Sequence, residues 1–247
     1  TIQSAMAGVK RIDAFLAGSE RALPPEREKA ARGDILLSHV TFGYGEKPVL
    51  CDFSMTVKEG EQVTLVGRTG AGKSTVFRLL LGLYKPESGR ITIGGIDVSK
   101  ITDSERRPCI GCVEQHFSRV PGTVYEQITL GDPRITAEMA EKAAKLAGID
   151  DAIRTLPDGY ATLCTDGMFS QGEWQLLSIA RAAAADPAIL LLDEITANLD
   201  AETEARVLEA LRRACKGRTV LSISHRIYES LGGRTVGIGT DNGKIQT

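Results

Sequence analysis

The sequence lacks the features that would assign it to a specialised class of protein. Its longest strongly apolar run, residues 188–192, is far shorter than the roughly 18 residues of a membrane-spanning helix. The net charge of −2 gives no sign of the basic surface that nucleic acid binding usually needs. The five cysteines are odd in number and scattered, so a secreted disulfide framework is not expected. With 42% hydrophobic and 25% charged residues, the chain has the composition of a soluble globular protein with a full core.

Two of the cysteines, Cys109 and Cys112, have the spacing of a metal-binding or redox pair. The chain has no second pair at this spacing, and His116 alone cannot complete a zinc site. We therefore interpret both cysteines as small side chains in a buried strand.

The first 32 residues differ in pattern from the rest of the chain. Apolar residues from Ile2 to Leu16 recur at near-helical spacing and predict an amphipathic helix. The charged, proline-containing stretch from Gly18 to Arg32 predicts a linker. Because the chain begins at Thr1 without a methionine and shows no signal peptide, we expect it to be a part of a longer protein.

From residue 34 onward, the order of the predicted elements indicates an α/β fold with two additions. Strands alternate with helices, which favours a mostly parallel sheet. Extra strands at the front and a helical stretch over about 124–185 predict an N-terminal antiparallel β subdomain and an inserted helical subdomain. Strands are expected at 35–42, 53–57, 62–66, near 91, at 110–113, 188–193 and 219–224, helices at 73–83, 136–146, 170–185 and 201–216, and a hairpin over 236–246.

Residues 67–75 match the P-loop pattern, with Gly67, Gly72, Lys73 and Ser74 in register. The segment follows an apolar strand and opens a helix, where backbone N–H groups and the helix N-terminus attract phosphate. Lys73 is expected to reach the β- and γ-phosphates, and the Ser74 hydroxyl to ligate Mg²⁺. The alternative, a simple glycine-rich turn, is disfavoured by this strand–loop–helix context. The residues expected to bind the nucleotide are Gly67, Arg68, Thr69, Gly70, Ala71, Gly72, Lys73, Ser74 and Thr75.

Asp193 and Glu194 end an apolar strand, where two carboxylates are costly unless they meet a cation or a proton. Asp193 suits the Mg²⁺ shell of a nucleotide site, and Glu194 suits a base that polarises the attacking water. His225 follows another β-rich run, so the same sheet edge should present it. We interpret His225 as a γ-phosphate contact, although a lone histidine is usually an ordinary loop residue.

A second candidate for anion binding begins at Ser170. Ser170 and Glu173 have the spacing of a capping box, and the apolar residues that follow lie on one face of a helix. A helix N-terminus with Ser and Gly in its first turn attracts anions.

Taken together, the motifs resemble the nucleotide-binding domain of ATP-binding cassette (ABC) transporters, over nearly all of residues 30–247. In chain order they are Phe42-Gly-Tyr44-Gly, the P-loop, Gln115, Phe169-Ser-Gln-Gly172, Leu190-Leu-Leu-Asp-Glu194, Ala197-Asn-Leu-Asp200 and Ser224-His225. The resemblance implies a P-loop NTPase core that uses ATP and Mg²⁺. It also implies that two such domains join head to tail, each P-loop being closed by the partner's signature helix.

The resemblance further assigns roles to single residues. Ser170 and Gly172 would contact the γ-phosphate of the partner's ATP, although Ser170 can cap its helix at the same time. Tyr44, which is otherwise only a tyrosine in a turn, would stack on adenine. Gln115 would sense Mg²⁺ and the attacking water, and Asp200 would couple the two sites. The expected catalytic residues are Lys73, Gln115, Glu194 and His225, and the expected Mg²⁺ ligands are Ser74, Gln115 and Asp193.

Exporters of this family fuse the ATPase domain to the end of a membrane domain. We therefore assign residues 1–32 to a helical tail of the membrane domain plus a linker, and residues 33–247 to the ATP-binding domain, with its helical subdomain at about 116–186. The full-length protein is expected to lie in the membrane, with this domain on the cytoplasmic face. Its expected partner is a second ABC ATPase domain rather than nucleic acid, and the sequence does not identify the transported substrate.

The signature departs from the usual Leu-Ser-Gly-Gly-Gln at Phe169, Gln171 and Glu173. As a capping-box partner Glu173 stabilises its own helix start by about 0.5–2 kcal/mol, but it also places an anion where a partner's γ-phosphate should dock. We therefore expect the ATP site that this signature completes to be weak. Such asymmetry suits a heterodimer, while a homodimer stays open.

Two other classes of protein are weighed against the exporter. A soluble ABC-type ATPase acting on nucleic acid or the ribosome should carry a coiled coil, tandem cassettes or a basic face, none of which the sequence indicates. A regulatory nucleotide-binding module without turnover is disfavoured by Glu194 and His225.

Overall fold

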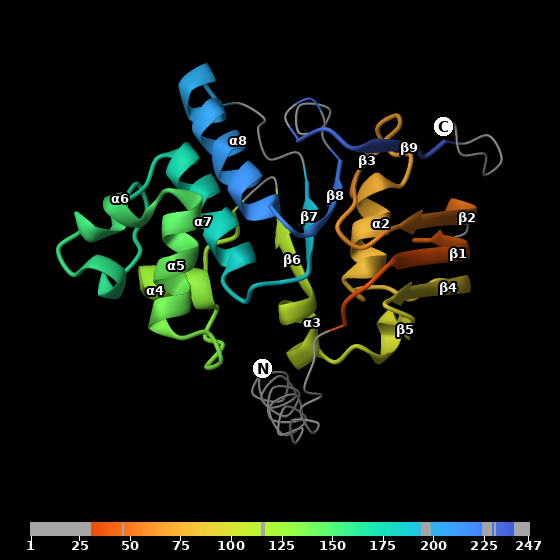
Figure 1. Cartoon of the computed structure of the whole chain (residues 1–247), viewed down its shortest axis with the longest axis horizontal. Helices are drawn as coiled ribbons and strands as arrows, with labels where there is room; N and C mark the ends of the chain where they lie inside the picture. The colour runs from red at the N-terminus through yellow and green to blue at the C-terminus, as the bar shows by residue number, and fades with distance from the viewer. Residues whose placement is uncertain are drawn as a thin grey trace, which may run out of the picture.

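The computed structural model describes residues 31–45, 47–114, 117–193, 199–223, 229 and 231–239. These residues form an antiparallel sheet, a parallel sheet and a group of helices, which follow one another from right to left in Figure 1. Helices and strands therefore occur as the predicted fold class requires.

The antiparallel sheet is built by the N-terminal part of the chain, in the strand order β2-β1-β4-β5. The strands are β1 (Ile35–Gly43), β2 (Pro48–Val57), β4 (Ser88–Ile93) and β5 (Ile96–Asp97). Alternate side chains of β1, such as Ile35 and Leu37, are fully buried, as expected for a sheet with one face on the core. A bulge between Leu37 and Val40 preserves the inward face further along the strand.

The second sheet is entirely parallel and has the strand order β6-β7-β8-β3-β9. The strands are β3 (Gln62–Val66), β6 (Ile110–Val113), β7 (Ile189–Leu192), β8 (Thr219–Ser222) and β9 (Arg234–Gly237). All four residues of β7 are buried, because the sheet is covered on both faces. Ile189 and Leu191 join the core that includes the antiparallel sheet and helix α2 (Lys73–Leu80), whereas Leu190 and Leu192 join the core formed with the later helices.

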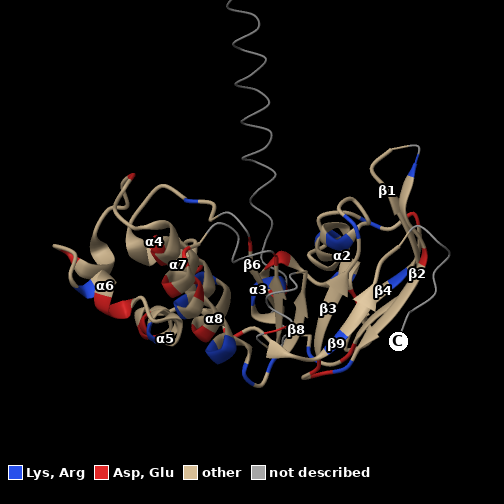
Figure 2. Ribbon diagram, turned by 90° about the horizontal axis from the view of Figure 1, so that it is seen from above, with Lys and Arg blue, Asp and Glu red and all other residues tan. Residues whose placement is uncertain are grey.

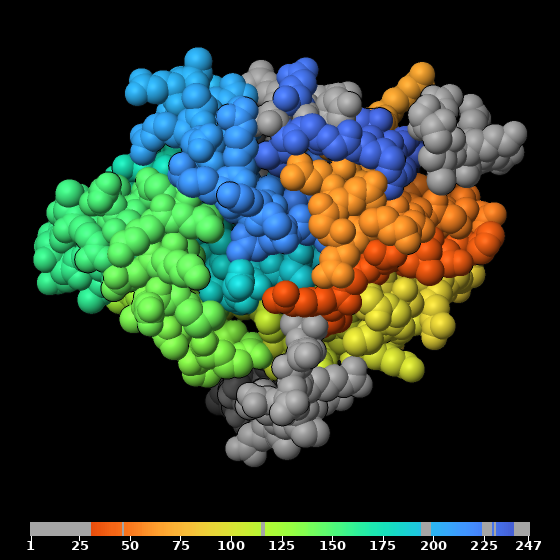
Figure 3. All heavy atoms as spheres, in the orientation of Figure 1, coloured from red at the N-terminus to blue at the C-terminus, as the bar shows by residue number. Residues whose placement is uncertain are grey.

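The later helices form the second lobe of the molecule. They are α4 (Val124–Thr129), α5 (Ala137–Ala147), α6 (Asp150–Arg154), α7 (Gln171–Ala183) and α8 (Ala201–Cys215). Buried alanines on α5 permit close packing against its neighbours. In Figure 3 the green residues of α4 to α6 lie on one side, the red to yellow N-terminal residues lie on the other, and the cyan and blue residues lie between them. Helices α4 to α7 fall within residues 116–186, but the domain limits themselves stay predictions.

Several element boundaries differ from expectation. Helix α2 ends at Leu80 rather than at residue 83, because Gly82 takes a left-handed conformation with φ of 68°. Strand β2 begins at Pro48 rather than at residue 53. Helix α3 (Asp103–Cys109) was not expected, although its Thr102 and Glu105 form a capping box. The interpretation of Cys109 as a strand residue is therefore wrong, because Cys109 is the last residue of this helix.

The two ends of the chain are described only in part. Ala31, at the end of the predicted linker, is buried, and the Cys109 thiol donates to its carbonyl oxygen at 3.3 Å. Val236 belongs to β9, which pairs with β3 in parallel as a strand of the main sheet. The predicted hairpin turn at 241–243 and the predicted helix of residues 2–16 lie outside the described residues.

Basic and acidic residues are interspersed along the described part of the chain, as Figure 2 shows. None of the described helices is both long and apolar enough to span a membrane.

Candidate functional site

The predicted P-loop and Asp193 lie along one edge of the parallel sheet. Val113 is level with Leu192, Leu192 with Ser222, and Ser222 with Thr64. Because these strands are parallel, the segments that follow them leave the sheet at the same edge, which is where α/β proteins bind ligands. The backbone N–H of Asp193 donates to the Val113 carbonyl at 2.9 Å and holds Asp193 at this edge.

The backbone of the P-loop is shaped at two of its glycines. A Cβ on Gly67 would lie 2.3 Å from the carbonyl oxygen of Ile238, so no larger residue fits beside β9. Gly72 has a φ of 100°, a conformation that side chains rarely adopt. Gly72 is also the N-cap of α2 and makes no side-chain cap, so the first N–H groups of that helix stay available for an anion.

Lys73 lies back over the loop. Its Nζ donates to the carbonyls of Gly67 at 2.8 Å and of Arg68 at 3.0 Å. Backbone amides, this ammonium group, the half-buried Ser74 and the carboxylate of Asp193 are therefore gathered at one edge. Such a donor set fits phosphate with a hard cation, because Mg²⁺ prefers oxygen ligands.

Tyr44 is fixed beside the start of α2. Its ring meets the rings of Phe42 and Tyr84 edge to face, with centroids 5.0 and 5.2 Å apart. Its hydroxyl lies 3.3 Å from the Thr75 hydroxyl and accepts a hydrogen bond from Arg78 at 2.9 Å. Since the residue stays 48% exposed, part of the ring is open to a ligand. The contribution of Tyr84 was missed, because it depends on a contact between residues that are distant in sequence.

The capping box predicted at Ser170 is confirmed. The Glu173 N–H donates to the Ser170 Oγ at 3.3 Å, and the Ser170 N–H donates to the Glu173 Oε2 at 2.8 Å. The same Oε2 also accepts the Ser170 hydroxyl at 2.9 Å. The hydroxyl hydrogen of Ser170 is thus directed to a carboxylate of its own chain.

Gly172 is buried against the first turn of α8. A Cβ at this position would lie 2.2 Å from the Cγ2 of Thr203. Hydrogen bonds from the Thr203 side chain and backbone hold the pKa of Asp200, the N-cap of α8, below its ordinary value. The close approach of the two helices therefore places Asp200 and the signature helix side by side. The sequence pattern did not reveal this contact.

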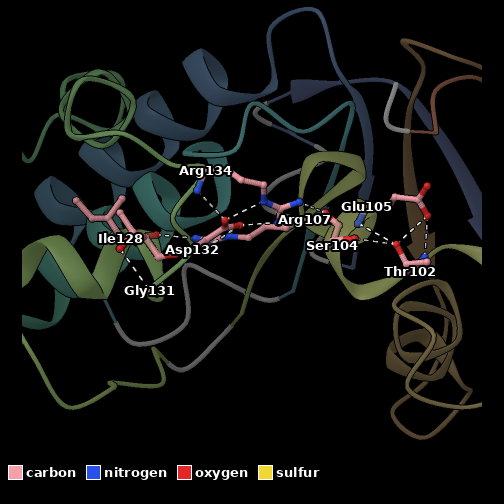
Figure 4. Close-up of polar contacts among 9 residues, drawn as sticks. Thr102, Ser104, Glu105, Arg107, Ile128, Gly131, Asp132 and Arg134 are labelled. Atoms are coloured by element: carbon pink, nitrogen blue, oxygen red, sulfur yellow. Dashed lines mark hydrogen bonds and ion pairs between the residues drawn. The ribbon is translucent and has the colours of Figure 1, made fainter. Parts of the chain in front are cut away.

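A partly buried arginine connects helix α3, which precedes strand β6 of the parallel sheet, to the end of helix α4 (Figure 4). Arg107 of α3 donates to the carbonyls of Ile128, at 2.7 Å, and Thr129, at the end of α4. Its Nη1 also lies 3.8 Å from Asp132, which pairs with Arg134 at 2.7 Å. Cations are favourable at the carbonyl end of a helix, so this network stabilises the contact between α3 and the end of α4.

Neither Cys109 nor Cys112 forms a disulfide bond. Burial raises the pKa of Cys109 to about 11 and that of Cys112 to about 12. Thiols that bind metals or act in redox chemistry have lowered pKa values, so these two cysteines have the properties of structural residues.

Three predicted site residues, Gln115, Glu194 and His225, lie outside the described residues. Their roles stay predictions.

Most of the chain matches the model of a known protein family. A family model described as "ABC transporter" matches residues 50–197. The chain is 40% identical over 236 residues to an ABC transporter ATP-binding protein, YfiC, of Bacillus subtilis, which covers 92% of this chain and 39% of that protein. It is 38% identical over 230 residues to a fatty acid ABC transporter ATP-binding/permease protein of Mycobacterium bovis, which covers 92% of this chain and 36% of that protein.

A solved structure is similar over a comparable range. The structure of a bacterial Atm1-family ABC exporter with ATP bound matches with a TM-score of 0.77 and 32% sequence identity, over 98% of this chain and 44% of that chain. The present chain thus spans less than half the length of each of these three proteins.

Proposed function

This chain belongs to the ABC transporter family, and from that premise we propose that it is the ATP-hydrolysing domain of a membrane exporter. The observation that carries the proposal is the shared sheet edge of the P-loop and Asp193, together with the open N-terminus of α2. Phosphate requires converging N–H donors and Mg²⁺ requires oxygen ligands, and this edge offers both.

The proposed nucleotide contacts follow the donors at that edge. Lys73 exchanges its two loop carbonyls for phosphate oxygens, while the P-loop amides surround the remaining phosphate charge. Ser74 and Asp193, with Gln115, hold Mg²⁺, which supplies positive charge to the phosphates when it is bound. The exposed part of the Tyr44 ring stacks on adenine.

For hydrolysis we assign Glu194 as the base and His225 as a γ-phosphate contact. Glu194 accepts a proton from water as the water oxygen attacks the γ-phosphorus, and the bond to the β–γ bridging oxygen breaks to give ADP and phosphate. Glu194→Gln is expected to bind ATP as the parent does and to lose phosphate release. Normal phosphate release by that variant would refute the assigned base, whereas loss of ATP binding in Lys73→Ala tests the P-loop separately.

The proposed partner is a second ABC ATPase domain, joined head to tail. Ser170 is exposed at the start of α7, which supports its role as a contact to the partner's ATP. Asp200, which is held beside the same helix, is proposed to couple the two sites.

Glu173 weakens the ATP site of the partner domain, which the start of α7 is proposed to complete. Its Oε2 accepts the Ser170 hydroxyl at 2.9 Å and places negative charge where the partner's γ-phosphate would arrive. We therefore propose slow turnover at the site that this signature completes, and a heterodimer in which the chain's own P-loop site is the active one.

The signature proposal is tested by Glu173→Gln in the full-length transporter, which should raise ATP turnover. A matched control is Glu126→Gln, which alters the equivalent capping box with Thr123 on α4. Equal effects of the two variants, or no gain from Glu173→Gln in turnover and in ATP-driven closure of the pair, would remove the idea.

We also propose that the full-length protein carries a fused membrane domain, with residues 1–32 as its helical tail and linker and this domain on the cytoplasmic face. The Mycobacterium bovis relative is described as an ATP-binding/permease protein, which supports the fusion. Reconstitution of the full-length protein in vesicles tests this proposal, because nucleotide added outside inverted vesicles should be hydrolysed and should drive substrate uptake into them. Hydrolysis without any coupled transport would contradict the exporter assignment.

A further inference from the structure

Three aromatic rings gather where β1 ends, beside helix α2. The rings of Phe42, Tyr44 and Tyr84 each contact the other two, with centroids 5.0, 5.2 and 5.5 Å apart. Phe42 is buried in the core, whereas Tyr44 and Tyr84 stay 48% and 43% exposed. Tyr44 therefore has one neighbour that anchors it to the core and a second, Tyr84, that reaches it at the surface from a distant part of the chain.

The end of α2 fixes the backbone that carries Tyr84. The N–H of Leu83 donates to the carbonyl of Arg78 at 3.0 Å. The N–H of Gly82, which has a left-handed φ of 68°, donates to the carbonyl of Leu79 at 3.0 Å. These two hydrogen bonds form a Schellman motif, so the chain leaves α2 toward Tyr84 in one defined direction.

The residues that follow Tyr84 are tied to the end of β1, from which Tyr44 extends. The backbone N–H of Glu87 donates to the carbonyl of Thr41 at 2.9 Å. The side chain of Glu87 accepts the N–H of Gly43 at 3.0 Å. The two tyrosine rings therefore meet between backbone segments that are bonded to one another.

The hydroxyl end of Tyr44 is bound to α2. It accepts a hydrogen bond from Arg78 at 2.9 Å and lies 3.3 Å from the Thr75 hydroxyl. Arg78 and Thr75 are three residues apart, so their side chains leave the same side of the helix. Because Thr75 is also the last residue of the P-loop match, these contacts fix the Tyr44 ring relative to the phosphate-binding backbone.

We propose that Tyr84 and Arg78 are positioning residues that hold the Tyr44 ring in place for stacking on the base of the bound nucleotide. A side chain that becomes ordered only when a ligand packs on it loses rotamer freedom, and this loss lowers the affinity. Here the fold has already restricted the ring, through Tyr84 at its side and Arg78 at its hydroxyl. Both residues should raise the affinity for a nucleotide, through Tyr44, and not the affinity for phosphates alone. The inference rests on the proposed function, since it takes Tyr44 as the surface on which adenine stacks.

Tripolyphosphate separates the two contributions, because it has the phosphates of ATP without ribose and base. The dissociation constants of Mg²⁺-ATP and Mg²⁺-tripolyphosphate are measured by isothermal titration calorimetry on the 247-residue chain. Tyr84→Leu should weaken ATP binding roughly 2- to 10-fold, the size of one aromatic contact, and leave tripolyphosphate binding unchanged. Tyr84→Phe keeps the ring and should bind both ligands as the parent does. The matched control is Leu83→Ala, at a neighbouring residue that is 65% exposed, and it should change neither affinity.

Arg78 is tested by a double-mutant cycle with the Tyr44 hydroxyl. Arg78→Met and Tyr44→Phe each remove the hydrogen bond between the two side chains. Each should weaken ATP binding, relative to tripolyphosphate binding, by roughly 2- to 10-fold. Because both changes remove the same bond, Arg78→Met should have no further effect when it is added to Tyr44→Phe. Additive losses would show that Arg78 does not act through Tyr44.

The outcomes separate this inference from the proposed function. Absence of Mg²⁺-ATP binding by the parent contradicts the proposed function itself. If Tyr44→Leu lowers the affinity for ATP relative to tripolyphosphate and Tyr84→Leu does not, the positioning role is overturned and the proposed function stays. An equal loss of both ligands in Tyr84→Leu also overturns it, because a general disturbance of the fold would have this effect. No relative loss in either variant refutes stacking of the base on Tyr44, and the positioning role with it.

Discussion

The contact between Gly172 and Thr203 determines how closely α7 and α8 approach, and a pair of substitutions tests it. Gly172 lies within α7 and has no left-handed φ, so its backbone suits alanine. In an open position Gly172→Ala would stabilise the helix by about 0.5–1 kcal/mol. Here the new Cβ would lie 2.2 Å from the Cγ2 of Thr203, far inside the ordinary carbon–carbon contact distance of about 3.5–4.0 Å.

Relief of this overlap requires either an unfavourable rotamer of Thr203 or a separation of the two helices, and overpacking of this kind costs about 1–3 kcal/mol. Gly172→Ala alone should therefore lower the free energy of unfolding by roughly 0.5–2 kcal/mol. Thr203→Ser removes the offending methyl group, and the nearest remaining Thr203 atom, Cβ, would then lie 3.5 Å away. In that background Gly172→Ala should become neutral or stabilising.

The assay is urea unfolding of the parent, the two single variants and the double variant. The predicted result is a coupling energy of about 1–3 kcal/mol between the two positions, with a change of sign for the alanine substitution. If Gly172→Ala changes the free energy of unfolding equally in the parent and in the Thr203→Ser variant, the contact does not set the helix spacing and the reasoning is refuted.

Three further predictions concern other parts of the chain. Cys51 is exposed, whereas burial raises the pKa of Cys109 to about 11 and that of Cys215 to about 12. An alkylating reagent at neutral pH should therefore modify Cys51 first and the two buried cysteines only after unfolding, which mass spectrometry measures. The hydrogen bond from Arg134 lowers the pKa of Asp132 below its ordinary value of 3.8, so the stabilisation from Asp132 is present above pH 3.8 and is lost as the pH falls through the lowered pKa. Asp132→Asn should therefore weaken the loss of stability in acid, as measured by urea unfolding at several pH values. An unchanged pH dependence would contradict the assignment. Arg107→Met removes two hydrogen bonds to the carbonyls of Ile128 and Thr129, of which the Thr129 carbonyl keeps the Asp132 N–H, and should cost about 1–3 kcal/mol of unfolding free energy. Urea unfolding checks this value, with Arg90→Met on the exposed face of β4 as the control.

Features that depend on neighbouring residues were predictable from the sequence. The Ser170–Glu173 capping box and the start of α2 at Lys73 formed as expected, because each depends on contacts within a few residues. The strand predicted over 188–193 formed over 189–192, because its continuous apolar run is itself a local pattern. The family resemblance was readable for the same reason, since each motif is a short local pattern. The end of α2 was predicted less well, because the left-handed Gly82 outweighed the helical pattern that continues to Leu83.

Contacts between distant segments were decided only by the tertiary structure. The stack of Trp174 on Phe117 and the fit of Gly172 against Thr203 each join parts of the chain whose meeting depends on strand order and helix packing. No local pattern encodes these contacts, because most of the free energy that brings the segments together comes from burying the whole shared core. The sequence by itself therefore determined that the chain has a P-loop and a capped signature helix. The folded sheet and its covering helices decided which distant residues pack around each of these two parts.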